Sequence, residues 1–68
     1  MNDETLNMSI RTLLKTVGIS SQREIEQAVA KALASGELKG TETLPATMTL
    51  DIVGLKLNVV FKGEVSLQ

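Results

Sequence analysis

The spacing of the apolar residues changes once along this chain of 68 residues, and that change most constrains the fold. Before Gly36 apolar residues recur every three or four positions, which is the period of an amphipathic helix. From Ala46 to Phe61 they alternate with other residues, which is the period of a half-buried strand. Pro45 stands between the two patterns and prevents a further helix there. The sequence therefore predicts a single small α+β domain over residues 1–68, with helices first and strands second.

Glycines divide and close the helical part. Gly18 follows the last residue of a first apolar stripe, at the position of a left-handed C-cap. Ser21 and Glu24 then form a capping box, in which each side chain accepts from the other residue's amide. We expect helices at about 4–17 and 22–35, joined by a sharp corner, with Gly36 ending the second. The stripes are Leu6, Ile10, Leu13, Leu14 and Val17, then Ile25, Ala28, Val29, Ala32 and Leu33.

The alternation of apolar and polar residues along the strands sets their predicted pairing. A two-residue turn at Val53-Gly54 brings Leu50 opposite Leu57 and places the apolar side chains on one face, which a one-residue slip would scramble. A three-residue loop over Phe61–Gly63, with glycine in the left-handed position, then leads to a third strand. The predicted strands are about 46–52, 55–60 and 64–67. The expected fold is an N-terminal two-helix hairpin packed on one face of a three-stranded antiparallel β-meander.

Most residue types that carry enzyme chemistry are missing. The chain has no cysteine, histidine or tyrosine, and Phe61 is its only aromatic residue. This composition excludes a thiol nucleophile, a histidine base and a disulfide, and it leaves no aromatic platform for stacking bases. No spacing resembles a metal site, a P-loop or a dinucleotide fingerprint. We therefore predict a protein that is not an enzyme, with no catalytic residue, no metal and no cofactor.

The predicted corner at Gly18–Arg23 is one candidate binding site. A helix N-terminus there would expose free amides, which favour phosphate or carboxylate groups, and the outline resembles a helix-turn-helix. The alternative is a cap that only holds the corner together. Glu24, Glu26 and a net charge of −1 weigh against nucleic acid. The candidate anion or nucleic-acid residues are Ser20, Ser21, Arg23, Arg11 and Lys15.

The first predicted strand is the other candidate. Thr47, Met48 and Thr49 form an edge without the lysines that usually guard one, so it could accept a strand from a second copy or from a partner peptide. The alternative is a short edge made harmless by Pro45. A domain of this size without a disulfide or a metal has a marginal core, which favours self-association. We expect a small protein-interaction module that binds a protein partner or forms a homodimer, and weak anion or nucleic-acid binding is the alternative.

The N-terminus is acidic, and no apolar run approaches the ~18 residues that span a bilayer, so we expect a cytoplasmic protein without a membrane segment. Two segments resemble a known family: Asn7–Arg11 continuing through Val17–Glu26, and Leu38–Gly40 continuing through Leu44–Met48. They are similar to a family of very short bacterial proteins catalogued as a domain of unknown function. The resemblance implies a bacterial, stand-alone cytoplasmic protein. It carries over no functional residue, because that family has no established activity.

Overall fold

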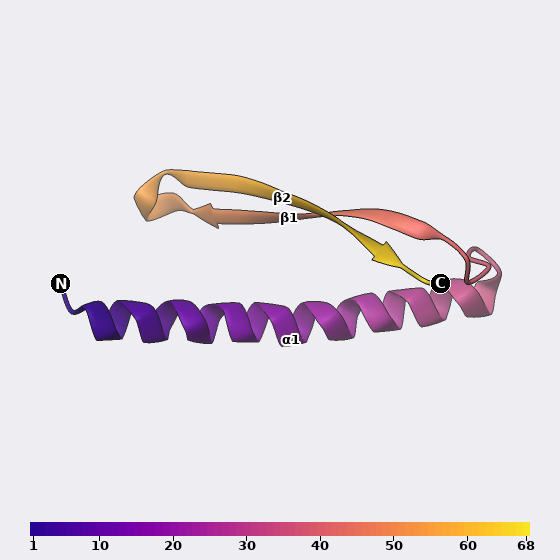
Figure 1. Cartoon of the computed structure of the whole chain (residues 1–68), viewed down its shortest axis with the longest axis horizontal. Helices are drawn as coiled ribbons and strands as arrows, with labels where there is room; N and C mark the ends of the chain where they lie inside the picture. The colour runs from indigo at the N-terminus through magenta and orange to yellow at the C-terminus, as the bar shows by residue number, and fades with distance from the viewer. The chain divides into compact units, whose positions relative to one another are not determined.

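The computed structural model describes all 68 residues, which form two compact units, Met1–Glu37 and Leu38–Gln68. The first unit is helix α1 (Asp3–Ser35), which Figure 1 shows as one uninterrupted coil. The second unit contains strand β1 (Thr43–Ile52), the 3-10 helix η1 (Val53–Leu55) and strand β2 (Leu57–Ser66). The predicted two-helix hairpin with a three-stranded meander is therefore wrong: the chain has one long helix and a two-stranded sheet.

Both ends of α1 are capped. The side-chain oxygen of Asn2 accepts hydrogen bonds from the amides of Glu4 (3.0 Å) and Thr5 (3.1 Å), as an N-cap does. At the other end Gly36 has a φ of 82°, and its amide and that of Glu37 donate to carbonyls of the last turn. This is a left-handed glycine cap. The predicted end of the helical part at Gly36 is confirmed.

Gly18 lies inside α1 and does not have a positive φ. The predicted corner after Val17, with its capping box at Ser21, is therefore wrong. A glycine in a helix interior costs only about 1 kcal/mol relative to alanine. Val17 and Ala28 are 11 residues apart, which is about three turns, so the two predicted stripes overlap on one side of a single helix before the second winds round toward Leu33. This overlap outweighs the local stop signal.

Replacing Gly18 by alanine should stabilise the protein by about 1 kcal/mol, because alanine favours the helix and its methyl group would meet no atom within 4 Å. A left-handed corner at this position would give the opposite sign. Gly36→Ala is the control and should destabilise by about 1 kcal/mol, because its φ of 82° is unfavourable for a residue with a side chain. Urea unfolding at one protein concentration measures both variants. A destabilising Gly18→Ala would contradict the continuous helix.

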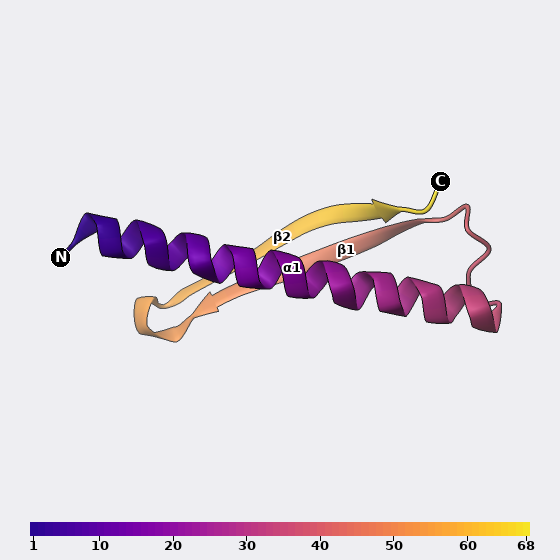
Figure 2. The same ribbon diagram turned by 90° about the horizontal axis from the view of Figure 1, so that it is seen from below.

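β1 and β2 pair as an antiparallel hairpin, and they lie side by side in both views (Figures 1 and 2). Leu50 is opposite Val59, and Met48 is opposite Phe61. The register is therefore shifted by two residues from the predicted one, while the apolar side chains still share one face. We call this face the apolar sheet face. It consists of Leu44, Ala46, Met48, Leu50 and Ile52, opposite Val65, Gly63, Phe61, Val59 and Leu57 in that order.

Four residues, Val53–Lys56, connect the strands. Lys56 has a φ of 53°, and its amide donates to the Val53 carbonyl at 3.0 Å. The predicted two-residue turn at Val53-Gly54 is wrong, because such turns need a positive φ at their first residue and a β-branched valine disfavours it. Lengthening the connection by two residues keeps every side chain on its own face.

β2 continues to Ser66 without a second turn, so the predicted loop at Phe61–Gly63 and the third strand at 64–67 are wrong. Gly63 has no positive φ and lies opposite Ala46. The reason is the length of β1, which begins at Thr43, three residues before the predicted start. With the two-residue shift, residues 61–66 find partners along β1 and remain extended.

β1 accommodates Pro45 because the missing N–H lies on the free edge. The Leu67 amide donates to the Glu42 carbonyl at 2.9 Å. In an antiparallel pair this makes the even-numbered residues of β1 the hydrogen-bonded ones, so Pro45 and Glu64 form a non-hydrogen-bonded pair. Proline therefore costs the ladder nothing at this position. Each strand of this sheet keeps one unpaired edge.

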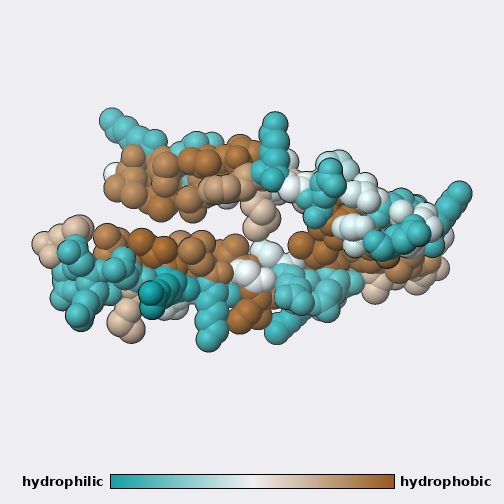
Figure 3. Space-filling view, viewed as in Figure 1, coloured by the Kyte–Doolittle hydropathy of each residue, from teal (hydrophilic) through white to brown (hydrophobic).

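Neither unit contains a buried side chain. A single helix and a two-stranded sheet each have two sides and no interior of their own. Sixteen large apolar side chains are exposed, among them Leu14 at 58% and Phe61 at 56%. Figure 3 shows apolar residues gathered along the helix and along the hairpin. These surfaces are therefore the features that need a functional explanation.

Candidate functional site

α1 carries apolar side chains on two sides. Ile19 is nine residues from Ile10, and Val17 is nine from Met8, and nine residues at about 100° each place the members of a pair on opposite sides. Met8 (68%) and Ile19 (52%) are both exposed. One layer packed against the first side would leave these two residues uncovered. We call the helically spaced set that begins on this first side and winds round α1 toward Leu33 the apolar stripe: Leu6, Ile10, Leu13, Leu14, Val17, Ile25, Ala28, Val29, Ala32 and Leu33.

The predicted interaction edge lies in the middle of β1. The outer side of this strand is unpaired, because the sheet has only two strands. Thr47 and Thr49 belong to non-hydrogen-bonded pairs, so their amides point to the free edge. Met48 instead contributes its side chain to the apolar sheet face. Binding of a strand at this edge stays a prediction.

The residues of the predicted anion site are spread along α1. Ser20, Ser21 and Arg23 lie inside the helix, where backbone amides donate to carbonyls one turn earlier. Arg11 and Lys15 are one turn apart, and Arg23 is about 12 Å beyond Lys15 along the axis. The helix N-terminus on which this site depended is at Asp3 instead. Anion binding by these side chains stays a prediction. The backbone amides that were expected to take part are not free, because they donate within the helix.

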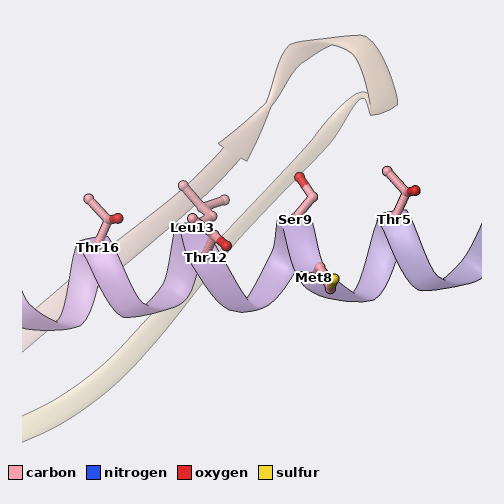
Figure 4. A pocket seen from close by; sticks show the side chains of 6 residues that line it. All are labelled: Thr5, Met8, Ser9, Thr12, Leu13 and Thr16. Carbon is pink, nitrogen blue, oxygen red and sulfur yellow. The ribbon is translucent and has the colours of Figure 1, made fainter.

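Two shallow hollows lie on α1 alone. Figure 4 shows the first, in which four hydroxyl side chains follow one another along the helix beside Met8 and Leu13. Both hollows are lined by residues of α1 alone, so neither encloses a ligand. Their residues are Thr5, Met8, Ser9, Thr12, Leu13 and Thr16 in the first, and Ile19, Gln22, Arg23 and Glu26 in the second.

The Glu42 carboxylate organises the connection that leads into β1. It accepts hydrogen bonds from the amides of Lys39 (2.9 Å), Gly40 (3.0 Å) and Thr41 (3.1 Å). Gly40 has a φ of 98°, which glycine adopts without strain. The Lys39 amide contributes most to lowering the pKa of Glu42; desolvation opposes this, and the other amides support it. Sequence reasoning missed this cluster, for which a left-handed glycine two residues before an acid is the only signal.

Glu42→Gln should remove an acid-sensitive step from this connection. Because the pKa of Glu42 is lower in the folded protein, its carboxylate stabilises the fold above the unfolded value and loses this effect as the pH falls through the folded value. We expect the NMR signals of the Lys39, Gly40 and Thr41 amides to shift together at pH values below 4.5, the ordinary pKa of the group. The variant should show no such step, whereas Glu37→Gln should keep it. Wild-type amides that do not titrate would contradict the hydrogen bonds.

Two further findings concern metal binding and membrane spanning. No three acidic residues come together in an arrangement that could hold a metal ion. No helix combines the length and the apolar character that crossing a membrane requires. The exposed apolar surfaces and the two free strand edges are the candidate functional features.

Comparison with known proteins identifies a family whose function is unknown. No curated protein and no solved structure matches the chain. A family model described as a family of unknown function (DUF6494) matches residues 1–68. The resemblance inferred from the sequence is confirmed in this respect, while the expected bacterial origin stays a prediction. Because the match covers the whole length of the sequence, the chain belongs to this family of unknown function, DUF6494.

Proposed function

We propose that this protein is a small, non-catalytic interaction module that associates with copies of itself. The observation that carries the proposal is the exposure of sixteen large apolar side chains on two units that bury none. Large contiguous apolar surfaces on a soluble protein mark interaction sites. An isolated two-stranded hairpin is only marginally stable in water, and most helical stability comes from packing an apolar side. Both units therefore need a covering surface.

Packing of α1 on the apolar sheet face of its own chain is the competing arrangement. It would cover one side of α1 and leave Met8 and Ile19 in water. The chain also lacks the cysteine and histidine residues with which small proteins of this size strengthen a marginal core. A second copy supplies a further layer, so that the apolar stripe and the side with Met8 and Ile19 can both be covered.

The side-chain inventory supports a non-catalytic role. Without cysteine, histidine and tyrosine, a reaction would depend on perturbed acidic, lysine or hydroxyl groups gathered in a cleft. The hollows of α1 are open: the first gathers hydroxyl groups without an acid or a lysine, and the second holds one acid, Glu26, without a lysine. The lack of cysteine also suits a reducing compartment, so the proposal includes a cytoplasmic location.

Thermal unfolding at several protein concentrations tests this proposal. When folding is coupled to association, the unfolding midpoint rises with concentration. We expect a steady rise over about two decades of concentration. A cooperative transition whose midpoint does not depend on concentration would contradict self-association and favour packing within one chain.

A further inference from the structure

The free edge of β2 carries two charges that its own sheet leaves without a partner. Lys62 and Glu64 lie on the polar face of the sheet, two residues apart. Opposite them on β1 are Thr47 and Pro45, and every β1 residue on this face from 43 to 49 is uncharged. Opposite charges directly across a strand pair stabilise a sheet, and like charges destabilise it. The uncharged residues of β1 therefore neither attract nor repel the charges of Lys62 and Glu64.

These two residues also direct their amides outward. Lys62 and Glu64 belong to non-hydrogen-bonded pairs with β1, so their N–H and C=O groups point to the free edge. A strand added at this edge would therefore form hydrogen bonds with the same residues that carry the charges. Both the backbone and the side chains make this edge a template for another strand.

We infer that the protein dimerises by pairing β2 with β2 of a second copy, antiparallel, about a two-fold axis at Gly63. This inference rests on the proposed self-association and specifies the edge and the register. In this register Lys62 is opposite the partner's Glu64, and the symmetry repeats the pair. The two hairpins become one four-stranded sheet, and three or more strands with an apolar face can be stable where two are not.

Charge selects this register among its neighbours. An axis at Lys62 would place two lysines opposite each other, and an axis at Glu64 would do the same with two glutamates. Any register shifted by an odd number of residues would set the apolar face of one copy beside the polar face of the other. Among these closely spaced registers, only the axis at Gly63 pairs opposite charges twice.

The same register continues the apolar sheet face. Phe61 is then opposite the partner's Val65, and Val59 is opposite the partner's Leu67. Gly63 meets its own copy at the axis, in a non-hydrogen-bonded pair whose Cα atoms lie about 4.5 Å apart. The absence of a side chain at Gly63 suits this close approach.

The β1 edge is the less suitable one for a second copy. Pro45 removes an amide from it, and among its outward residues only Asp51 is charged, so no charge pair fixes a register there. Pairing β1 of one copy with β2 of the next would leave an edge free at each end and build open chains rather than a closed dimer.

Charge reversal tests the register. Lys62→Glu and Glu64→Lys should each raise the dimer dissociation constant at least about tenfold, because two attractive pairs become repulsive. The double variant exchanges the charges and should return to within about threefold of the unmodified protein. Lys56→Glu makes the same change of charge in the turn and should have less than about a threefold effect. Single reversals without effect, or a double variant that is not restored, would overturn the register.

A cysteine at the axis tests the same geometry without changing charge. The chain has no cysteine, and a side chain at Gly63 would meet no atom within 4 Å. Facing Cα atoms about 4.5 Å apart permit a disulfide, so Gly63→Cys should cross-link most of the protein under mild oxidation. Thr49→Cys, in the middle of the β1 edge, should not cross-link.

The molar mass of the unmodified protein, measured in parallel, separates the two levels of the proposal. A dimer whose Gly63→Cys variant does not cross-link would overturn the β2 pairing and leave self-association standing. Cross-linking through Thr49→Cys alone would overturn it in favour of the β1 edge. A monomeric unmodified protein would overturn the inference and the proposed function together.

Discussion

Replacing Val17 by aspartate should dissociate the protein, raising the dimer dissociation constant about 100-fold or more. Val17 lies in the apolar stripe and is 39% exposed in the single chain. If a second copy covers the stripe, the new carboxylate must lose its hydration without gaining a partner. A 100-fold change corresponds to about 2.7 kcal/mol, which is modest for a desolvated charge. Size-exclusion chromatography with light scattering measures the change.

The neighbouring residue provides a matched control for this variant. Thr16→Asp introduces the same charge one position earlier, about 100° around the helix and outside the apolar stripe. Valine and threonine have similar helix propensities, so both variants change the intrinsic helix stability by similar amounts. Thr16→Asp should change the dissociation constant by less than about threefold. Equal effects of the two variants would show that the apolar stripe is not the interface.

Phe61→Ala should lower the free energy of unfolding by about 3 kcal/mol or more, the usual cost of removing a packed phenylalanine. Phe61 lies on the apolar sheet face opposite Met48 and is 56% exposed in the single chain. The large loss is expected only if another surface covers this face. Urea unfolding at one fixed protein concentration gives the value.

Val60→Ala is the control for the sheet. Val60 is the residue before Phe61 on the same strand. It is 51% exposed and lies on the polar face opposite Thr49. Its loss should cost about 1 kcal/mol or less, mostly through β-propensity. A Phe61→Ala loss as small as that of Val60→Ala would mean that the apolar sheet face stays in water.

The helical part shows where sequence reasoning succeeds and where it fails. The apolar period and the cap at Gly36 were sufficient to predict helix as far as Ser35. Gly18 and the Ser21–Glu24 pair then suggested a break that does not exist. Each of these signals is worth about 1 kcal/mol, whereas the helical spacing of the apolar residues extends over the whole helix. The 11-residue spacing from Val17 to Ala28, about three turns, was the sign in favour of one helix that continues through Gly18.

The hairpin shows a different limit. The alternation of side chains correctly predicted which residues share a face, because a slip by one residue would exchange the faces. The alternation could not distinguish registers that differ by two residues, such as Leu50 opposite Leu57 and Leu50 opposite Val59. The turn decides between them, and a β-branched Val53 was the local sign against a two-residue turn. The error then propagated to the third strand.

The candidate surfaces were only partly visible in the sequence. The unguarded edge at Thr47–Thr49 could be read from composition, but the importance of the β2 edge depends on the observed register, which leaves Lys62 and Glu64 without charged partners. The Glu42 cluster was hidden because its partners are backbone amides, for which Gly40, two residues before the acid, is the only signal in the sequence. The extent of exposed apolar surface likewise depends on how many layers the chain forms.

Sedimentation equilibrium of the unmodified protein tests whether the chain associates with a second copy. If the exposed apolar surfaces are covered by a second copy, the molar mass should be about twice 7.3 kDa at micromolar concentrations and should fall on dilution. A molar mass of 7.3 kDa at every concentration, from a protein that still unfolds cooperatively, would contradict self-association.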